Sequence, residues 1–460
     1  MDYKTLSLWL ENPGEDLVPR ASLAGPCTVD VAILGGGFSG LWTAYYLLSQ
    51  DPSLDVAVIE KEVCGYGASG RNGGWVSPRF PLNPAVMTER FGAAATRAQI
   101  LAMHDTVEEV GRVIEKEGID AQYRRVELLS IARGDGQLAT LKASHAAYEV
   151  IGLGAHNHLV DAAAVEERVR VRDARAAILT PGAAMIQPAR LARGLASAVE
   201  RLGGTIYEKT EAIGVEPGAS PRIVCTSGAV TARKAVVMAG EAYLAKLPGY
   251  GRDVLPMSSM IVATQPLSEA QWQAIGWAGH EGLSSQVASV DYLSRTADGR
   301  IIYGTRGAPY LLGSRSPDNA ADLGSEFENM KKALVDWFPA LEGIGFSHQW
   351  SGYLGVSRDW APNIYFDRDT RIAGLYGYTG RGVPNTNMAA RLVSGLITGR
   401  QTGLESLPAN GLRSPRWEPE PLRWIGARYV QNALGRIDRA VAAGKPAPLD
   451  ARLARHFTRH

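Results

Sequence analysis

The chain has 460 residues, of which 45% are hydrophobic and 21% charged, and its formal net charge is +1. This composition is ordinary for a folded soluble protein, and the nearly neutral charge argues against nucleic acid or an anionic membrane as a partner. The three cysteines, Cys27, Cys64 and Cys225, are few and widely spaced, which argues against a disulfide framework and fits a reducing compartment.

The N-terminal residues predict no export or membrane anchoring. Asp2 and Lys4 lie in the first ten residues, where no long apolar run is found, so we expect no signal peptide. No segment approaches the roughly 20 apolar residues that a membrane span needs. We therefore expect a cytoplasmic protein without a membrane span, divided into two or three domains.

A strand–helix–strand unit follows an irregular leader at residues 1–28. Residues 29–34 are an apolar run that ends in three glycines, which is typical of a buried parallel strand. Apolar residues at helical spacing follow over 41–48, and 56–59 is a second apolar strand. Together these segments predict a βαβ unit of about 30 residues.

The turn of this unit matches the pattern G-x-G-x-x-G. Gly35 permits the tight turn, Gly37 lets the backbone approach a pyrophosphate at the helix N-terminus, and Gly40 allows close packing of helix on strand. Glu60 lies 20 residues after Gly40 and can accept hydrogen bonds from ribose hydroxyls, which disfavours NADP. We expect this dinucleotide site to contain Gly35, Gly37, Phe38, Ser39, Gly40, Glu60 and Lys61.

A second glycine-rich segment, 65–74, has five glycines in ten residues. Such a loop allows close approach of the backbone to a flat ligand, which favours FAD over NAD. Its polar side chains can bond phosphate or ring heteroatoms. This segment adds Gly67, Ala68, Ser69, Arg71, Asn72, Gly73 and Gly74 to the expected cofactor-binding residues.

Later segments predict a second kind of sheet. Helical spacing recurs near 99–114 and 191–202, and Asp298-Gly299 is typical of a hairpin turn between the strands 290–296 and 300–305. We expect an α/β fold, α+β overall, in which a Rossmann-type FAD-binding domain carries an inserted antiparallel-sheet substrate domain. The expected segments are 1–85, 161–248 and 350–410 for the FAD-binding domain, 86–160 and 249–349 for the substrate domain, and 411–460 for a helical tail. The Arg-rich tail is interpreted as a solvated helix face, with a partner-binding surface as the alternative.

The run over 29–75 resembles the FAD-dependent D-amino-acid oxidase and glycine oxidase superfamily. Through 67–74 it is similar to the γ-glutamylputrescine oxidase-like branch. Residues 236–243 resemble the second flavin-side strand and loop of the family, 350–362 its Trp-x-Gly…Pro segment, and 377–383 its C-terminal glycine loop beside the flavin. The resemblance implies non-covalent FAD and further cofactor contacts at Ala239, Gly240, Gly380, Gly382 and Val383.

The resemblance also implies a chemistry. A hydride passes from the carbon next to an amine nitrogen to flavin N5, the imine hydrolyses, and molecular oxygen reoxidises the flavin to give hydrogen peroxide. The substrate is then a small-molecule amine. Arg381 stands where the γ-glutamylputrescine oxidase-like pattern tends to have His, whereas glycine-oxidase-like relatives place Arg in a comparable loop.

Aromatic and arginine side chains are the candidate substrate contacts. Amine oxidation needs a neutral amine, and a poorly hydrated aromatic cavity disfavours the ammonium form. Arginine binds a carboxylate through a two-pronged pair of hydrogen bonds, and Arg381 could instead contact the flavin. The expected catalytic residues are Arg381, Tyr378, Trp75 and Arg306, with Tyr303, Tyr353 and Trp360 as further aromatic candidates. His104 is interpreted as a core or boundary residue and Cys64 as unattached to flavin, and no metal site is expected.

Three functions stay open from the sequence. The first is an amine oxidase for a γ-glutamyl-amine or similar long amine. The second is an oxidase or dehydrogenase of a glycine- or sarcosine-like amino acid that uses Arg381 for the carboxylate. The third is a flavin-binding subunit that needs a partner for activity.

Overall fold

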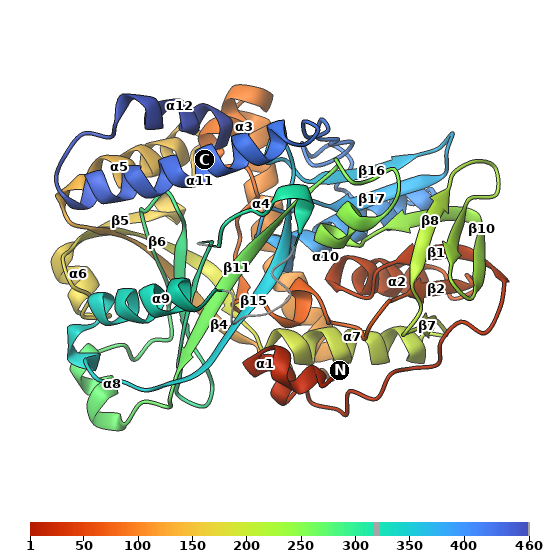
Figure 1. Ribbon diagram of the computed structural model, residues 1–460, viewed down its shortest axis with the longest axis horizontal. Helices are drawn as coiled ribbons and strands as arrows, with labels where there is room; N and C mark the ends of the chain where they lie inside the picture. The colour runs from red at the N-terminus through yellow and green to blue at the C-terminus, as the bar shows by residue number, and fades with distance from the viewer. Residues whose placement is uncertain (307, 316–322, 459–460) are drawn as a thin grey trace.

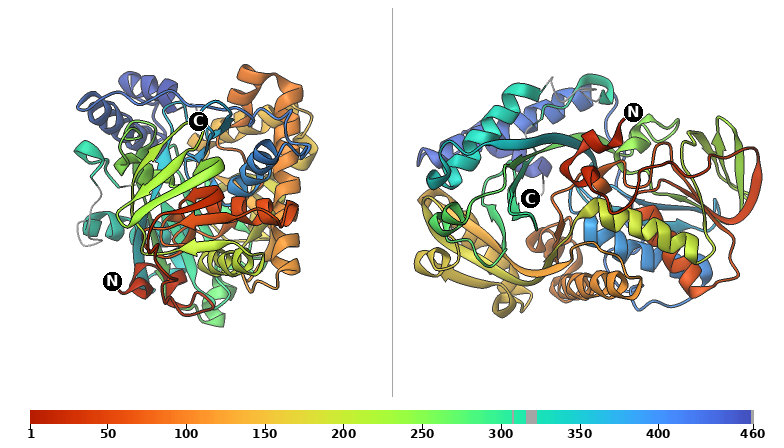
Figure 2. Two further views of the ribbon diagram at one scale, coloured as in Figure 1. Left: turned by 90° about the vertical axis from the view of Figure 1, so that its right-hand side faces the viewer. Right: turned by 90° about the horizontal axis from the view of Figure 1, so that it is seen from below.

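A computed structural model describes residues 1–306, 308–315 and 323–458. Two sheets lie side by side, each with its own helices (Figures 1 and 2). The strands of the first sheet are β1 (Cys27–Leu34), β2 (Val56–Ile59), β7 (Thr205–Tyr207), β8 (Ala212–Glu216), β9 (Arg222–Cys225), β10 (Gly228–Met238), β16 (Asn363–Asp367) and β17 (Ile372–Tyr376).

The first sheet has a parallel centre. Its main order is β16-β17-β10-β1-β2-β7, and every neighbouring pair from β17 to β7 is parallel. The four side chains of β2 are all buried, as expected for a strand covered on both faces. The predicted βαβ unit is therefore confirmed.

Helices cover this sheet. They are α2 (Phe38–Gln50), α4 (Ala93–Lys116), α7 (Pro188–Arg201) and α10 (Gly382–Thr398). Side chains of all four, among them Leu41, Met103, Leu191 and Met388, share one buried apolar cluster with β1 and β2. Segments far apart in sequence thus build one layer, which brings the start of α10 beside the start of α2.

The second sheet is mostly antiparallel. Its order is β15-β11-β14-β13-β12-β4-β6-β3, with β5 on β6. The predicted hairpin at Asp298-Gly299 is confirmed, because β13 pairs antiparallel with β14. The strands are β3 (Trp75–Val76), β4 (Arg124–Arg133), β5 (His158–Asp161), β6 (Ala174–Met185), β11 (Leu255–Thr264), β12 (Gly282–Ser285), β13 (Asp291–Arg295), β14 (Ile301–Thr305) and β15 (Phe346–Val356).

Strand pairing corrects two of the predicted segment boundaries. β6 lies in the expected FAD-binding segment 161–248, yet it pairs with β4 in the second sheet. β15 extends beyond the expected boundary at 350 and pairs with β11 in the same sheet. The predicted boundaries at 161 and 350 therefore fall too early, because an apolar strand does not reveal its partner strand from its own sequence.

The leader and the tail are more ordered than the sequence suggests. The leader contains a 3-10 turn (Tyr3–Leu6) and α1 (Leu8–Glu11), which pack on the 65–74 loop through Ser7 Oγ to Gly70 O (2.8 Å) and Trp9 Nε1 to Asn72 O (2.6 Å). The remaining helices are α3 (Pro84–Phe91), α5 (Asp135–Val150), α6 (Ala162–Glu166), α8 (Glu269–Ile275), α9 (Gly324–Trp337), α11 (Leu422–Ala442) and α12 (Leu449–Thr458).

The predicted helical tail is docked on the second sheet. Figure 1 shows α11 beside α5. The Asp438 carboxylate accepts hydrogen bonds from the backbone N–H groups of Ala288 (2.7 Å) and Ser289 (3.0 Å). α11 therefore has a face held against the protein, not only a solvated one. Among the described helices, none combines the length and apolarity needed to cross a lipid bilayer.

Candidate active site

A cavity of about 940 Å³ lies between the two sheets. Its lining includes every cofactor-binding and catalytic residue expected from the sequence except Gly40 and Gly74. A Cβ at Gly40 would overlap the carbonyl oxygen of Gly35, and one at Gly74 would lie 2.5 Å from the carbonyl oxygen of Ile186. These two glycines therefore permit close packing of the loops that shape the cavity.

The glycine turn opens the start of α2 toward the cavity. Gly35 has φ +112°, and a Cβ there would lie 2.6 Å from the carbonyl oxygen of Ala239. Gly37 caps α2 without any side-chain hydrogen bond, and a Cβ there would lie 3.0 Å from Ser69 Oγ. The helix N-terminus thus remains accessible to an anion.

Glu60 lies at the end of β2, beside this turn. Its two carboxylate oxygens accept hydrogen bonds from the N–H groups of Gly36 (2.8 Å) and Glu62 (2.9 Å). Burial raises the pKa of Glu60 to about 7, although these two hydrogen bonds act in the opposite direction. The backbone bonds fix the carboxylate at the cavity wall, where a ribose is expected in a βαβ dinucleotide site.

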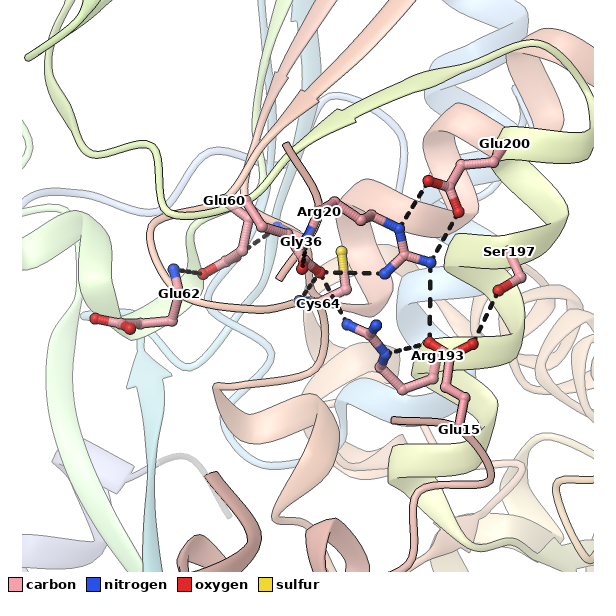
Figure 3. A network of polar contacts seen from close by, with 10 residues as sticks. Glu15, Arg20, Gly36, Glu60, Glu62, Cys64, Arg193, Ser197 and Glu200 are labelled. Carbon is pink, nitrogen blue, oxygen red and sulfur yellow. Dashed lines mark hydrogen bonds and ion pairs between the residues drawn. The ribbon is translucent and has the colours of Figure 1, made fainter. Parts of the chain in front are cut away.

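An ion-pair network lies behind the turn (Figure 3). Glu208 is fully buried and accepts from Arg193 Nη1 (2.9 Å) and from the N–H of Cys64 (2.7 Å). Burial raises the pKa of Glu208, but the Cys64 N–H and the guanidinium of Arg193 lower it more, so its pKa lies below the usual range. Cys64 is buried in this network and does not line the cavity, so no thiol meets a bound ligand there.

Side chains of the 65–74 loop hold its backbone in shape. Asn72 Nδ2 donates to Ala68 O (3.1 Å), and Asn72 Oδ1 accepts from the N–H of Gly74 (2.8 Å). Ser69 Oγ accepts from the N–H of Phe38 (2.8 Å), which ties the loop to the start of α2. The polar side chains expected to contact the cofactor thus also set the shape of the loop.

The C-terminal glycine loop is tied to the end of β10. Glu241 accepts hydrogen bonds from the N–H groups of Gly377 (2.7 Å) and Gly355 (2.9 Å), and burial raises its pKa to about 7. Tyr378 is buried, and its hydroxyl accepts from Ser39 Oγ at 3.3 Å. These contacts join the three loops that surround one end of the cavity. Glu241 stood in a motif that the sequence singled out, but its linking contacts could not be foreseen.

Besides Arg71, three arginines line the cavity, namely Arg79, Arg306 and Arg381. Arg306 Nη2 donates to Thr379 O (2.6 Å) and Arg381 Nη1 donates to Phe80 O (2.6 Å). Burial lowers the pKa of Arg306 to about 10 and that of Arg381 to about 9, and the charges of Arg79 and Arg306 contribute to the second shift. The sequence analysis missed Arg79, because β3 is too short to show which way the following residues turn.

The aromatic candidates separate into two groups. Trp75, Tyr353 and Tyr378 line the cavity, whereas Tyr303 and Trp360 are buried in the protein core and do not line it. The sequence analysis also missed Tyr292, which lines the cavity on β13; a Cβ at Gly73 or at Gly304 would overlap its ring. Nothing local marks Tyr292, since it reaches the site only through strand pairing.

Two other expectations concern His104 and metals. His104 is half-buried, does not line the cavity, and has a pKa lowered by burial, as suits a boundary residue. In the described part of the chain, no group of three His, Cys, Asp or Glu side chains could hold a metal ion.

Comparison with known proteins matches residues 30–396 to the family model described as DAO, FAD dependent oxidoreductase. The chain belongs to the DAO family. It is an FAD-dependent oxidoreductase, and the expected superfamily is confirmed. α11 and α12 lie outside the DAO match.

Two curated relatives are similar to this chain over most of its length. γ-Glutamylputrescine oxidoreductase of Escherichia coli (strain K12) is 30% identical over 417 residues, 89% of this chain and 94% of the relative. Glycine oxidase of Geobacillus kaustophilus (strain HTA426) is 24% identical over 395 residues, 82% and 95% of the two chains. The crystal structure of Geobacillus kaustophilus glycine oxidase has a TM-score of 0.67 at 21% identity, covering 84% of this chain and 99% of the other, which supports the shared fold.

The cavity of this DAO-family chain fits FAD. Three residues that line it have buried N–H groups without a hydrogen-bond partner in the described part of the chain, namely Arg71 Nη2, Trp75 Nε1 and Arg79 Nε. FAD carries many acceptor atoms on its ring and phosphates. The uncapped start of α2 suits the pyrophosphate, and buried donors suit the acceptors of a large polar ligand.

Proposed function

We propose that this protein oxidises the C–N bond of a small amine that carries an acidic group. The observation that carries the proposal is the presence of Arg306 and Arg381 in the same cavity as the glycine turn of the dinucleotide fold. A guanidinium in a poorly solvated site binds a carboxylate strongly and in a fixed orientation. The relatives named for amine and amino-acid oxidation support the same reaction class.

FAD, when bound, supplies the acceptor for the hydride that leaves the carbon next to the amine nitrogen. We propose that Gly35, Gly37 and Glu60 hold the dinucleotide part, and that the 65–74 and 380–383 loops hold the ring. Trp75 and Tyr378 then wall the reacting amine from water. Low hydration disfavours the ammonium form, so it keeps the nitrogen neutral with its lone pair available.

Two substrate types fit this proposal. A γ-glutamyl-amine is supported by the similarity to γ-glutamylputrescine oxidoreductase. A glycine- or sarcosine-like amino acid is supported by Arg381, whose position in the C-terminal loop suits a carboxylate close to the reacting carbon. In both cases the imine product hydrolyses, and we propose molecular oxygen as the final acceptor, with release of hydrogen peroxide.

A subunit that depends on a partner is less well supported. The tail helix that could serve as a docking surface lines the cavity of its own chain through Leu434, Ile437, Asp438 and Val441.

All three cysteines are free, which supports a reducing compartment such as the cytoplasm.

The test is anaerobic flavin reduction in the purified holoenzyme, followed by peroxide measurement in air. A panel of amines with and without a carboxylate, matched in length, is mixed in a stopped-flow instrument. We expect bleaching of the flavin by carboxylated amines and slower bleaching by their neutral analogues. Reduction by no amine, or equal rates for acidic and neutral amines, would contradict the proposal. Bleaching without peroxide in air would refute only oxygen as acceptor.

A further inference from the structure

The cavity opens to solvent at two places. Among the described residues, the lining side chains that are exposed form two groups, namely Lys61, Glu211 and Lys246, and Ala85, Thr140 and Ala143. The first group lies in the connections after β2, β7 and β10 of the first sheet, where the dinucleotide is proposed to bind. The second group lies on α3 and α5, and α5 packs on β4 and β6 of the second sheet. A bound dinucleotide therefore leaves the second opening accessible to a substrate.

One face of α5 runs from this second opening toward the arginines. The lining residues of α5 recur at helical spacing, namely Thr140, Ala143, Ser144, Ala147 and Tyr148. Thr140 and Ala143 are exposed, whereas Ala147 and Tyr148 are half-buried. Burial lowers the pKa of Arg381 to about 9, and Tyr148 lies near enough to act in the opposite direction. The face therefore leads from solvent to an arginine that is proposed to bind the acid.

A face of α11 adds a second wall beside this opening. Leu434, Ile437, Asp438 and Val441 line the cavity at the same helical spacing. The start of α5 meets the end of α11, since a Cβ at Gly136 would lie 2.6 Å from the carbonyl oxygen of Val441. Most of the side chains that these two helix faces present to the cavity are hydrocarbon, namely Ala143, Ala147, Leu434, Ile437 and Val441.

The length of this wall suits a long ligand. Tyr148 and Thr140 are eight residues apart, so the lining face of α5 is about 12 Å long. An extended peptide covers about 3.5 Å per residue, so a glycine- or sarcosine-like molecule at Arg381 would leave most of this face uncovered. A longer hydrocarbon chain would remove the apolar side chains of α5 and α11 from water, which favours its binding.

We propose that the substrate enters beside α5 and α11, and that it is an amine with several methylene groups whose hydrocarbon chain lies along these two helix faces. Ala143, Ala147 and Leu434 then determine which chain lengths and widths are accepted. This inference rests on the proposed function, since it names the substrate class of the same site. Of the two substrate types, it selects the longer one.

The experiment measures binding of straight-chain carboxylates that have no amine to oxidise, namely acetate, butyrate, hexanoate and octanoate. Each carries one carboxylate for Arg306 and Arg381, so only the length of the hydrocarbon chain differs. Dissociation constants are taken from the flavin absorbance change of the purified holoenzyme, with titration calorimetry as a second readout. We expect octanoate to bind at least about tenfold more tightly than acetate, a gain that burial of about two methylene groups would supply.

Variants place the hydrocarbon chain on the two helices. Ala143→Trp should narrow the opening and reduce the preference for octanoate to less than about threefold, with acetate binding unchanged. Ala146→Trp adds the same bulk on an exposed part of α5 that does not line the cavity, so it should change neither affinity. Leu434→Ala should weaken octanoate binding by about fourfold, the contribution of one buried methylene group, and leave acetate binding unchanged.

Flavin reduction in a stopped-flow instrument extends the test to amines. Sarcosine, N-hexylglycine and γ-glutamylputrescine are mixed with the wild type and with the two tryptophan variants. The second-order rate constant should be larger for a long amine than for sarcosine. Ala143→Trp should lower it for the long amine only, and Ala146→Trp for none of the three.

The outcomes separate this inference from the proposed function. Equal affinity for acetate and octanoate overturns the inference, and so does an equal effect of Ala143→Trp and Ala146→Trp. Unchanged octanoate binding in Leu434→Ala overturns the part assigned to α11. A preference for octanoate that depends on Ala143, together with no flavin reduction by any amine, overturns the amine oxidation and keeps the binding site on the two helices. Faster flavin reduction by sarcosine than by both long amines overturns the inference and keeps the proposed function.

Discussion

Replacing Arg381 by Met tests whether the buried charge of Arg381 destabilises the ligand-free protein and stabilises it only when an acid is bound. Burial and the charges of Arg79 and Arg306 lower the pKa of Arg381 to about 9, a shift that corresponds to about 5 kcal/mol of unfavourable environment. Methionine has a similar length and no charge, but it leaves the carbonyl of Phe80 without its donor, at a cost of about 1–3 kcal/mol. The ligand-free holoenzyme should therefore become more stable by about 2 kcal/mol.

The assay is thermal unfolding with FAD in excess, so that cofactor binding stabilises both proteins equally. We expect a Tm a few degrees higher for Arg381→Met than for wild type in the absence of acids. Added succinate should raise the Tm of the wild type but not that of the variant. The difference in Tm between the two proteins should therefore shrink or change sign. Arg439→Met is the control for loss of a charge on an exposed helix face. If Arg381→Met is less stable than wild type without ligand, the reasoning is wrong, because the buried charge of Arg381 would then not lower the free energy of unfolding.

Three further predictions concern the cofactor, the network behind the turn, and the tail. FAD should be released intact on denaturation, and Gly37→Val should abolish its binding, measured as bound flavin per chain; equal flavin content would refute the site. Arg193→Ala should lower the unfolding free energy by about 1–3 kcal/mol, because the buried Glu208 loses this partner but keeps Arg20. The pKa of Glu208 is lower in the folded than in the unfolded protein, so ionised Glu208 stabilises the fold at pH values above its unfolded pKa of about 4.3. In urea titrations, the difference in unfolding free energy between wild type and Arg193→Ala should shrink as the pH falls below that value. Asp438→Ala should loosen α11 by about 2 kcal/mol and speed proteolysis of the tail, whereas Asp450→Ala, which removes a surface ion pair, should not; equal rates would show that Asp438 does not anchor the helix.

The dinucleotide-binding part of the fold could be predicted from local sequence patterns. The apolar runs of β1 and β2 and the glycines between them are contiguous, so spacing alone indicates the βαβ unit. Most residues expected to bind cofactor therefore do line one cavity. The residues that sequence reasoning missed, Arg79 and Tyr292, come from the second sheet or its connections, where position depends on pairing between distant strands. The boundaries at 161 and 350 were wrong for the same reason.

The tail bears on how this fold could change its substrate in evolution. α11 supplies part of the cavity wall, yet it lies beyond the last residue of the family match, and Asp438 holds it to the loop between β12 and β13. Substitutions in 422–442 can thus reshape the cavity wall without altering the glycine turn or the flavin-side loops. Selection for new amines can act on this one C-terminal helix while the cofactor-binding half stays constant.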